Sequence, residues 1–222
     1  MCGRFSLATD VGDLQGRFYV LLDDVIYQPR YNIAPTQKVL AITNDGGRRA
    51  EYLRWGLVPP WAKDLSVGSR MINARAETVA VKPAFRTALR KRRCLILADG
   101  FYEWRQAGRA KIPMHIFLKL HVPFAFAGMW EEWRGPDGQA VRSCAIITTT
   151  ANELMESIHN RMPVILPREA ETFWLDPDND DVPALIDLLK PYPAEEMEAY
   201  RVSSLVNSPR NDTVECLVPL PA

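Results

Sequence analysis

The feature that most constrains this fold is a series of short aromatic and β-branched runs, separated by turn residues, along the first two thirds of the chain. Lys38–Thr43 and residues 48–55 flank Asn44-Asp45-Gly46-Gly47, which is the pattern of a β-hairpin. Further strands are predicted at residues 94–98, 101–104, 113–118, 124–129 and 141–150. Gly108, Pro123 and residues 135–138 supply turns between them. This pattern favours a barrel-like, largely antiparallel sheet.

Helices are predicted only around that sheet. Thr9 or Asp10 is placed to cap a helix that runs through Leu14, Phe18 and Leu22. Other helices are expected at residues 75–81, 84–90, 152–158, 168–174 and 182–189. No repeat, low-complexity tract or linker divides the chain. We therefore predict one α+β domain over residues 1–222, with peripheral helices around the sheet.

Composition excludes several classes of protein. The chain is 47% hydrophobic and 24% charged, which is typical of a globular protein. No apolar run approaches the ~20 residues of a membrane span, and the start lacks the apolar segment of an export signal. The four cysteines are far apart and form no CxxC pair. We expect a cytoplasmic protein with reduced thiols, no metal site and no membrane contact.

The zero net charge conceals an asymmetry between the two halves of the chain. Residues 1–111 hold 19 Lys and Arg against 10 Asp and Glu, whereas residues 112–222 hold 8 against 17. A chain of this kind can present a basic face to a polyanion and still remain soluble. The alternative is that the charges interleave on folding, and the charge pattern alone does not separate the two.

Cys2 is the first candidate for chemistry. Removal of the initiator methionine would leave cysteine at the start, with an α-amine of pKa ~8 beside a thiol of pKa ~8.5. Such a 1,2-aminothiol condenses with an aldehyde, first to a Schiff base and then to a thiazolidine. The neighbours Gly3 and Arg4 allow close backbone approach and offer a phosphate-binding fork. The alternative is an incidental second residue.

Three further polar residues are candidates, each with an ordinary structural alternative. Asn73 precedes a predicted helix, where it either caps that helix or holds a reacting group. Glu103 lies among aromatics in a predicted strand, where desolvation suits proton transfer, although strand glutamates also face solvent. His159 ends a predicted helix and is an acid/base candidate, whereas His115 and His121 are interpreted as structural.

An aromatic and basic segment, residues 54–63, contains Trp61 between Pro60 and Lys63. Exposed tryptophan beside cations is typical of proteins that stack single-stranded bases and hold their phosphates. Tryptophan also fills cores, and with six in the chain that is the interpretation for most of them. Trp61 is the one expected at the surface.

A series of motifs, taken in order, resembles the SOS-response-associated peptidase (SRAP) family. They are MCGRF, YNIAPTQ, RWGLVPPWAKD, INARAET, ADGFYEW, AGMWE, TTTAN and IHNRMP. The resemblance runs from the first residue to at least Pro167, and the closing residues 202–216 also look like the family's end. It implies an α+β fold around a barrel-like sheet, a basic cleft for single-stranded DNA, and covalent capture of abasic sites in the DNA damage response. Ordinary peptide hydrolysis is not implied.

The resemblance also implies roles for particular residues. The family's nucleophile falls on Cys2, and its active-site Asn, Glu and His fall on Asn73, Glu103 and His159. Its DNA contacts fall on Arg4, Trp61, Arg75 and Arg161, with Lys82 as a looser match. The implied partner is single-stranded DNA containing abasic sites, bound by a monomer without metal or organic cofactor.

Two positions depart from the family pattern. Asn160 stands where the resemblance predicts Asp, which removes a charge beside His159 and affects its basicity. Thr213-Val214 stand where a glycine-containing turn is expected. We expect the first to bear on the rate of reversal and the second only on local structure.

Three other functions remain open at the level of the residues. One is an N-terminal-nucleophile amidohydrolase, which also begins Met-Cys-Gly. Another is a cysteine peptidase that acts on its own Met1, and AP-lyase chemistry is a related possibility for the same site. The last is a DNA-binding module without catalysis.

Overall fold

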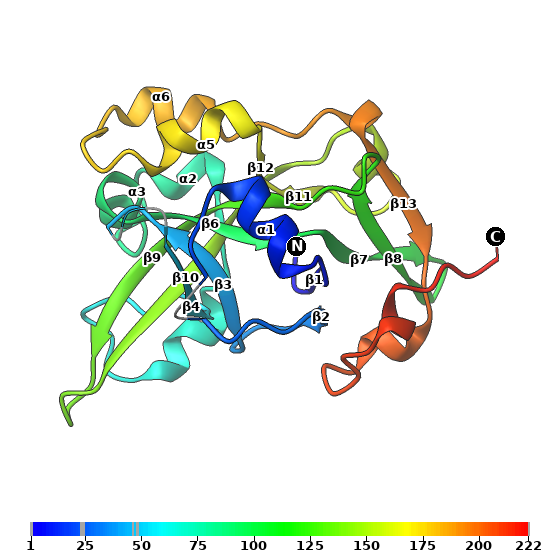
Figure 1. Ribbon diagram of the computed structural model, residues 1–222, viewed down its shortest axis with the longest axis horizontal. Coiled ribbons are helices and arrows are strands. Elements are labelled where there is room, and N and C mark those ends of the chain that lie inside the picture. Colours follow the sequence, from blue (N-terminus) through cyan, green and yellow to red (C-terminus); the bar gives the residue numbers. More distant parts are fainter. Residues whose placement is uncertain (1, 23–24, 46, 48, 222) are drawn as a thin grey trace.

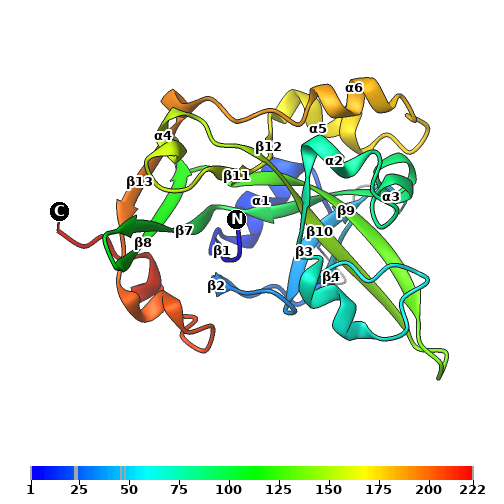
Figure 2. The same cartoon turned by 180° about the vertical axis from the view of Figure 1, so that it is seen from behind.

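The strands of the computed structural model form two sheets (Figure 1). The structure describes residues 2–22, 25–45, 47 and 49–221. One sheet runs in the order β13-β8-β7-β1-β2, and the other in the order β11-β10-β4-β3-β6-β9-β12, with β5 beside β10. The two sheets meet at the middle of the molecule, where β1 lies (Figure 2).

The larger sheet closes into a barrel, because its strands β10 and β9 also pair with each other. The barrel strands are β3 (Lys38–Thr43), β4 (Ala50–Trp55), β6 (Arg93–Ala98), β9 (Phe124–Arg134) and β10 (Ala140–Thr150). All neighbours around this ring are antiparallel except β10 and β4, which are parallel. The predicted α+β fold with a barrel-like, largely antiparallel sheet is confirmed.

Three short strands extend the barrel at one end. β5 (Asn73–Arg75) runs parallel to the end of β10, and β11 (Arg161–Pro163) pairs with the same stretch on the other side. β12 (Ile165–Leu166) continues the chain onto β9. Residues around Asn73 and around Arg161 are therefore brought to opposite sides of one strand.

The smaller sheet packs on the barrel through aromatic rings. Its strands are β1 (Phe5–Leu7), β2 (Arg30–Ile33), β7 (Gly100–Ala107), β8 (Ala110–Leu118) and β13 (Met197–Arg201). Phe5 meets Trp55 and Phe126 edge to face, with ring centroids 5.1 and 5.6 Å apart. This packing holds β1, a strand of the smaller sheet, against the barrel.

The helices are short and peripheral, as predicted. They are α1 (Val11–Phe18), α2 (Ala76–Val79), α3 (Arg86–Lys91), α4 (Glu153–Glu156), α5 (Arg168–Leu175) and α6 (Val182–Asp187), with 3-10 turns η1 (Leu65–Arg70), η2 (Ala194–Glu196), η3 (Ser204–Asn207) and η4 (Val214–Leu217). Asp10 caps α1 by accepting a hydrogen bond from the Gly12 amide at 2.8 Å. The helix ends before left-handed Tyr19 (φ 50°), so the prediction that it includes Leu22 is wrong.

A buried arginine joins helix α5 to the barrel. Arg93 on β6 donates to the backbone carbonyls of Trp174 at 2.7 Å and Leu89 at 2.9 Å, and Trp174 in turn donates to the Cys94 carbonyl at 3.1 Å. These bonds satisfy a cation that is fully removed from solvent. Strand β6 is buried along its whole length, which agrees with the apolar run that follows Arg93, residues 94–98.

The strand predictions hold for the barrel and for β7 and β8, but β1, β2, β5, β11, β12 and β13 were not predicted. Each is only two to five residues long, and its pairing depends on partners far along the chain. The predicted hairpin turn includes Gly46, and its second strand begins at Arg48; both lie outside the described residues. Within the described residues, no helix is long and apolar enough to cross a membrane.

Candidate active site

Cys2 lies at the centre of the candidate site and is fully buried. Its backbone carbonyl accepts a hydrogen bond of 2.7 Å from Nδ2 of Asn73 on β5. The other amide atom, Oδ1 of Asn73, is also buried, and no described residue donates a hydrogen bond to it. An amide in this position presents an acceptor beside the start of the chain, which suits an amine donor.

Glu103 on β7 is within electrostatic reach of Cys2. Burial raises the pKa of the Cys2 thiol, and the negative charge of Glu103 raises it further. Strand pairing brings the two together, because Phe5 is opposite Phe101 and the Arg4 carbonyl accepts a bond from the Tyr102 amide at 2.9 Å. Glu103 is only 4% exposed. The site therefore holds a protonated thiol next to a buried carboxyl group.

His159 follows helix α4, which begins where Asn152 accepts a bond from the Met155 amide at 2.9 Å. The His159 amide donates to the Met155 carbonyl at 2.7 Å, which turns the chain toward β11. The half-buried imidazole accepts a 3.0 Å bond at Nδ1 from the amide of Arg161. In the neutral ring the proton is therefore on Nε2. Asn160, the departure from the family pattern, is exposed.

The sequence assigned five residues to DNA contact, and the structure divides them into two groups. Trp61 is 64% exposed, and Arg75 and Lys82 are exposed as well. These three residues are called the rim. Arg4 is only 8% exposed and the Arg161 side chain 14%, and both guanidinium groups are engaged by protein acceptors.

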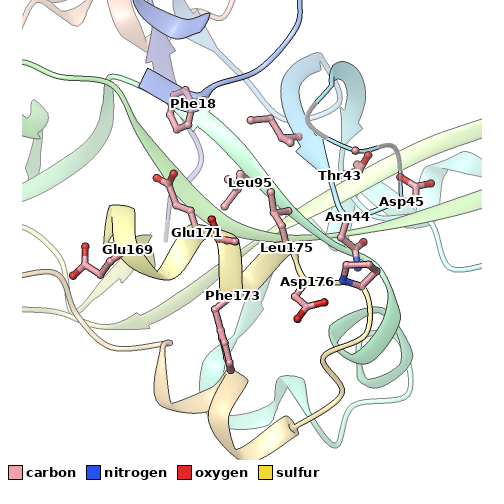
Figure 3. Close-up of a pocket in the computed structure, with 14 residues that line it drawn as sticks. Phe18, Thr43, Asn44, Asp45, Leu95, Glu169, Glu171, Phe173, Leu175 and Asp176 are labelled. Carbon is pink, nitrogen blue, oxygen red and sulfur yellow. The ribbon is translucent and has the colours of Figure 1, made fainter. Parts of the chain in front are cut away.

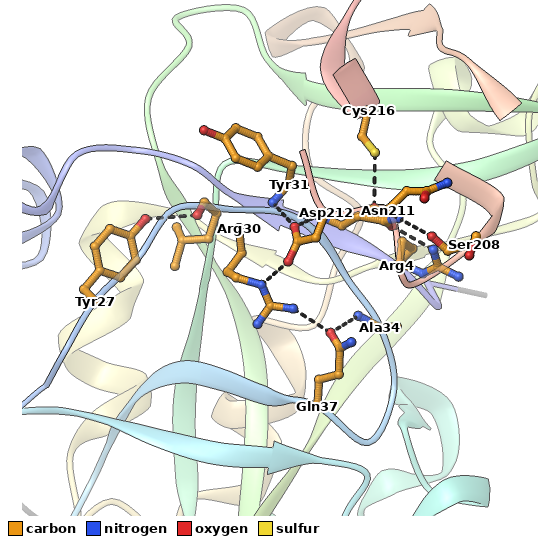
Figure 4. A network of polar contacts seen from close by, with 12 residues as sticks. Arg4, Tyr27, Arg30, Tyr31, Ala34, Gln37, Ser208, Asn211, Asp212 and Cys216 are labelled. Atoms are coloured by element: carbon orange, nitrogen blue, oxygen red, sulfur yellow. Dashed lines mark hydrogen bonds and ion pairs between the residues drawn. The ribbon is translucent and has the colours of Figure 1, made fainter. Parts of the chain in front are cut away.

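Arg4 belongs to a network that joins β1 and β2 to the C-terminal segment (Figure 4). Its Nη1 donates to Oδ1 of Asn32 at 2.7 Å and to the carbonyl of Val206 at 2.5 Å. Its guanidinium also lies 5.8 Å from the ring centroid of Trp104. Because Arg4 is two residues after Cys2, these contacts restrain the backbone on which the candidate nucleophile is carried.

Asp212 binds strand β2, which is the second strand in this network. Its Oδ1 accepts bonds from the amides of Tyr31 at 2.6 Å and Asn32 at 2.9 Å, and its Oδ2 pairs with Nε of Arg30. Asn32 donates through Nδ2 to the Asn211 carbonyl at 2.6 Å. We call Arg4, Asn32 and Asp212 the clamp.

The sequence analysis missed Asn32 and Asp212 as site-supporting residues. The only available signal was the place of Asn32 in the YNIAPTQ motif. At the second departure, Thr213 is extended (φ −135°) and leads into η4. No left-handed residue is required there, which explains why glycine is absent.

His115 lies in the core of the smaller sheet. It contacts Oγ of Ser6 at 3.3 Å and the hydroxyl of Tyr200 at 3.1 Å. Burial, with a smaller contribution from His121, lowers the pKa of His115 to about 3. A Cβ at Gly100 would come within 2.1 Å of the imidazole, so glycine is required beside it. His115 is therefore a neutral packing residue at physiological pH.

A cavity of about 770 Å³ lies between α1, α5, β3 and β6 (Figure 3). Its lining combines apolar side chains, including Phe18 and Leu95, with the carboxylates of Asp45, Glu169, Glu171 and Asp176. None of the residues predicted for the site lines it. Its acidic lining does not suit a phosphate backbone, so the candidate site is at Cys2 and not in this cavity.

The four cysteine thiols are free and buried. Across the described ranges, no group of three or more His, Cys, Asp and Glu side chains is arranged to hold a metal ion.

The fold and the site define a class: a closed barrel with a buried cysteine just before the N-terminal strand β1, bonded through its carbonyl to an amide and within electrostatic reach of a buried carboxyl group. The chain belongs to the SOS response associated peptidase (SRAP) family, whose model matches residues 1–209. It is 53% identical to the abasic site processing protein YoqW of Bacillus subtilis (strain 168), over 98% of this chain and 99% of that protein. It is 35% identical to the abasic site processing protein HMCES of Gallus gallus, over 99% of this chain and 78% of that protein.

Two solved structures share the fold of this chain. A protein from Bacteroides thetaiotaomicron superposes with a TM-score of 0.90 at 30% identity and covers 99% of this chain and 100% of its own. A protein from Bordetella bronchiseptica superposes with a TM-score of 0.81 at 27% identity, over 91% of this chain and 100% of its own.

Proposed function

We propose that this protein processes abasic sites by capturing them covalently in single-stranded DNA, through a thiazolidine formed on Cys2 after Met1 is removed. The observation that carries the proposal is the contact between Asn73 and the Cys2 backbone, next to a buried thiol and the carboxyl group of Glu103. Relatives at 53% and 35% identity bear the name abasic site processing protein, which supports the same function.

The α-amine acts before the thiol in this mechanism. The raised pKa keeps the thiol protonated at neutral pH, whereas an α-amine with a pKa of ~8 is partly neutral there. The amine nitrogen adds to the aldehyde carbon C1′ of the ring-opened sugar, and loss of water gives a Schiff base. The thiol sulfur then adds to the same carbon while its proton passes to the nitrogen, which closes the five-membered ring.

The surrounding residues move protons and hold the amine in this scheme. Asn73 orients the amine, because its buried Oδ1 accepts an N–H while Nδ2 holds the Cys2 carbonyl. Glu103 takes the proton released on amine attack and returns it to the departing water. His159 exchanges a proton with the ring-opened sugar oxygen through Nε2, since Nδ1 is engaged by the Arg161 amide.

Ring closure protects the strand. A Schiff base at an abasic sugar favours β-elimination and hence strand cleavage, which is the AP-lyase outcome. Removal of the imine by thiol addition prevents this cleavage. Positioning amine, thiol and aldehyde together is expected to supply the main rate advantage, since effective molarities can reach ~10⁵ M or more.

The rim supplies contacts to the strand. Trp61 is available for stacking on a base, and Arg75 and Lys82 are available to phosphates. Affinity should therefore fall with rising salt. Base specificity should be weak, because an abasic target has no base to read.

The thiol's surroundings do not favour a cysteine peptidase that depends on a thiolate of lowered pKa, because burial and Glu103 raise the pKa of this thiol. An N-terminal-nucleophile amidohydrolase activates its thiol with the freed α-amine, so a direct assay separates that alternative. Incubation with glutamine or with unrelated peptides checks this argument. Turnover abolished by Cys2→Ala, without any adduct on abasic DNA, would support the alternative.

The decisive experiment mixes Met1-processed protein with single-stranded DNA carrying one abasic site, followed by denaturing electrophoresis and intact-mass measurement. We expect a heat-stable conjugate with the mass of protein plus DNA less one water. Cys2→Ala and Cys2→Ser both keep the α-amine but lack the thiol, so each should yield a conjugate only after the Schiff base is reduced with borohydride. Heat-stable conjugate from unreduced Cys2→Ser, or none from the wild type, contradicts the proposal.

A further inference from the structure

Arg161 is held by a carboxylate in the geometry that a phosphate would use. Its Nη1 donates to Oε1 of Glu77 at 2.5 Å and its Nη2 to Oε2 at 3.1 Å, which is a bidentate pair. On the inner side, Nη2 also donates to the carbonyl of Thr148 at 2.6 Å. The backbone of β10 therefore fixes the guanidinium, and Glu77 accepts from both terminal nitrogens, whereas Nε is buried without a hydrogen-bond partner among the described residues.

The two partners of this ion pair differ in exposure. The Arg161 side chain is 14% exposed, whereas that of Glu77 is 47% exposed. The carboxylate therefore lies on the solvent side of the pair and can leave without disturbing the core. The bond to Thr148 keeps the guanidinium in place when it does.

Two cations converge on Glu77. The hydrogen bond from Arg161 is the main reason that the pKa of Glu77 is lowered, and the charges of Arg161 and Arg75 contribute. Arg75 itself is exposed on the neighbouring strand β5, where it is opposite Thr148 of β10. The two guanidinium groups of Arg161 and Arg75 carry one more charge than Glu77 neutralises. The site is therefore complementary to an added anion.

We propose that Glu77 occupies a phosphate subsite of Arg161 and Arg75 and is displaced by a backbone phosphate when the DNA strand binds. This inference rests on the proposed function and deepens it. The carboxylate of Glu77 lowers the affinity for any DNA strand, because a phosphate can pair with Arg161 only after the ion pair between Glu77 and Arg161 is broken. It also couples strand binding to the candidate acid/base, since the Arg161 amide is bonded to His159.

The test measures non-covalent binding of a labelled oligothymidylate without an abasic site, by fluorescence anisotropy in a Cys2→Ala background. We expect Glu77→Gln to lower the dissociation constant several-fold. The matched control is Glu195→Gln, which removes the same charge at an exposed position of η2. The proposal is overturned if Glu77→Gln binds the oligothymidylate no more tightly than this control does.

A double variant separates displacement from a general charge effect. In an Arg161→Gln background, Glu77→Gln should improve binding by a smaller factor, because only Arg75 is then left for the carboxylate to mask, and persistence of the full improvement contradicts the inference. Should Glu77→Gln fail to fold, Glu77→Asp keeps the charge but is too short to pair bidentately, and it should tighten binding by a smaller factor. Unchanged binding by folded Glu77→Asp counts against the proposal. Failure of the wild type to form any abasic-site conjugate overturns the proposed function instead.

Discussion

The clamp and the rim each contain an arginine, and the two arginines lie in opposite environments. Arg4 in the clamp is 8% exposed and bonded to Asn32 and Val206, whereas Arg75 and Trp61 in the rim are open to solvent. A nucleophile such as Cys2 requires a backbone that is held in place. A DNA strand of variable sequence instead requires exposed hydrogen-bond donors and an exposed aromatic ring. The residues predicted to contact DNA therefore include a buried arginine that is bonded within the protein and exposed side chains that are open to a ligand.

The segment around Trp61, residues 56–68, is nonetheless anchored to the rest of the fold. Gly56 has φ +125°, and a Cβ there would come within 2.6 Å of the Gly68 carbonyl oxygen. Trp133 donates to the Ala62 carbonyl at 2.8 Å, next to Trp61. The loop backbone is thus anchored while the Trp61 ring stays exposed, so exposure here reflects side-chain placement and not a loose chain.

The largest expected effect is the pH dependence of stability that is caused by His115 in the core of the smaller sheet. His115 has its pKa lowered to about 3 by burial, so the unfolded chain binds a proton more readily below pH ~6.5. Stability is therefore lost as pH falls from ~6.5 toward ~3, by roughly 4 kcal/mol from this residue. Chemical denaturation across that range measures it. His115→Gln should flatten the dependence, and an equal pH slope in both proteins would contradict the assignment.

Arg4→Met and Arg75→Met form a matched pair across the two regions. Arg4→Met removes the donor to the buried Asn32 side-chain oxygen and leaves the Val206 carbonyl only the longer bond from Nδ2 of Asn32, so the unfolding free energy should fall by about 3 kcal/mol. Arg75→Met should change it by less than ~0.5 kcal/mol, because the side chain is exposed. Urea unfolding of both variants measures the two changes in unfolding free energy. Similar losses in the two would remove the distinction between clamp and rim.

Trp61→Ala should act on binding and not on folding. Loss of a stacking ring costs ~1–3 kcal/mol per base, so affinity for single-stranded DNA should fall about 10-fold or more. The melting temperature should stay within ~2 °C of the wild type, since the ring is 64% exposed. Anisotropy and thermal unfolding of the same preparation give both values. A stability loss without an affinity loss would assign Trp61 to packing.

The smallest expected effect belongs to Lys82. Lys82→Met should reduce affinity only modestly and should lower the slope of log affinity against log salt by about 0.7, the value for one phosphate contact on a single strand. A salt titration of oligothymidylate binding measures the slope. Lys38→Met, at an exposed position on β3, is the control and should leave it unchanged. Equal slopes for wild type and Lys82→Met would remove this residue from the interface.

Local sequence patterns predicted the barrel strands well. Runs such as β3, β6 and β9 are rich in branched and aromatic residues, and their preference for extended structure needs only near neighbours. The length of α1 was overestimated, because the apolar spacing continues to Leu22 although the chain turns at Tyr19. Short strands such as β5 and β11 carry too few residues to show a period of their own.

The amino-acid order alone indicated a barrel-like α+β domain, a cysteine with unusual chemistry at position 2, and the residue types around it. The tertiary structure decided which of these residues meet. Cys2 and Asn73 are 71 positions apart in the chain, and Arg4 and Val206 are 202 apart. Contacts across such separations depend on how two sheets close and pack, whereas strand and helix preferences depend on neighbours within a few residues. Only the folded chain could therefore separate an arginine that holds the backbone from one that remains available to a ligand.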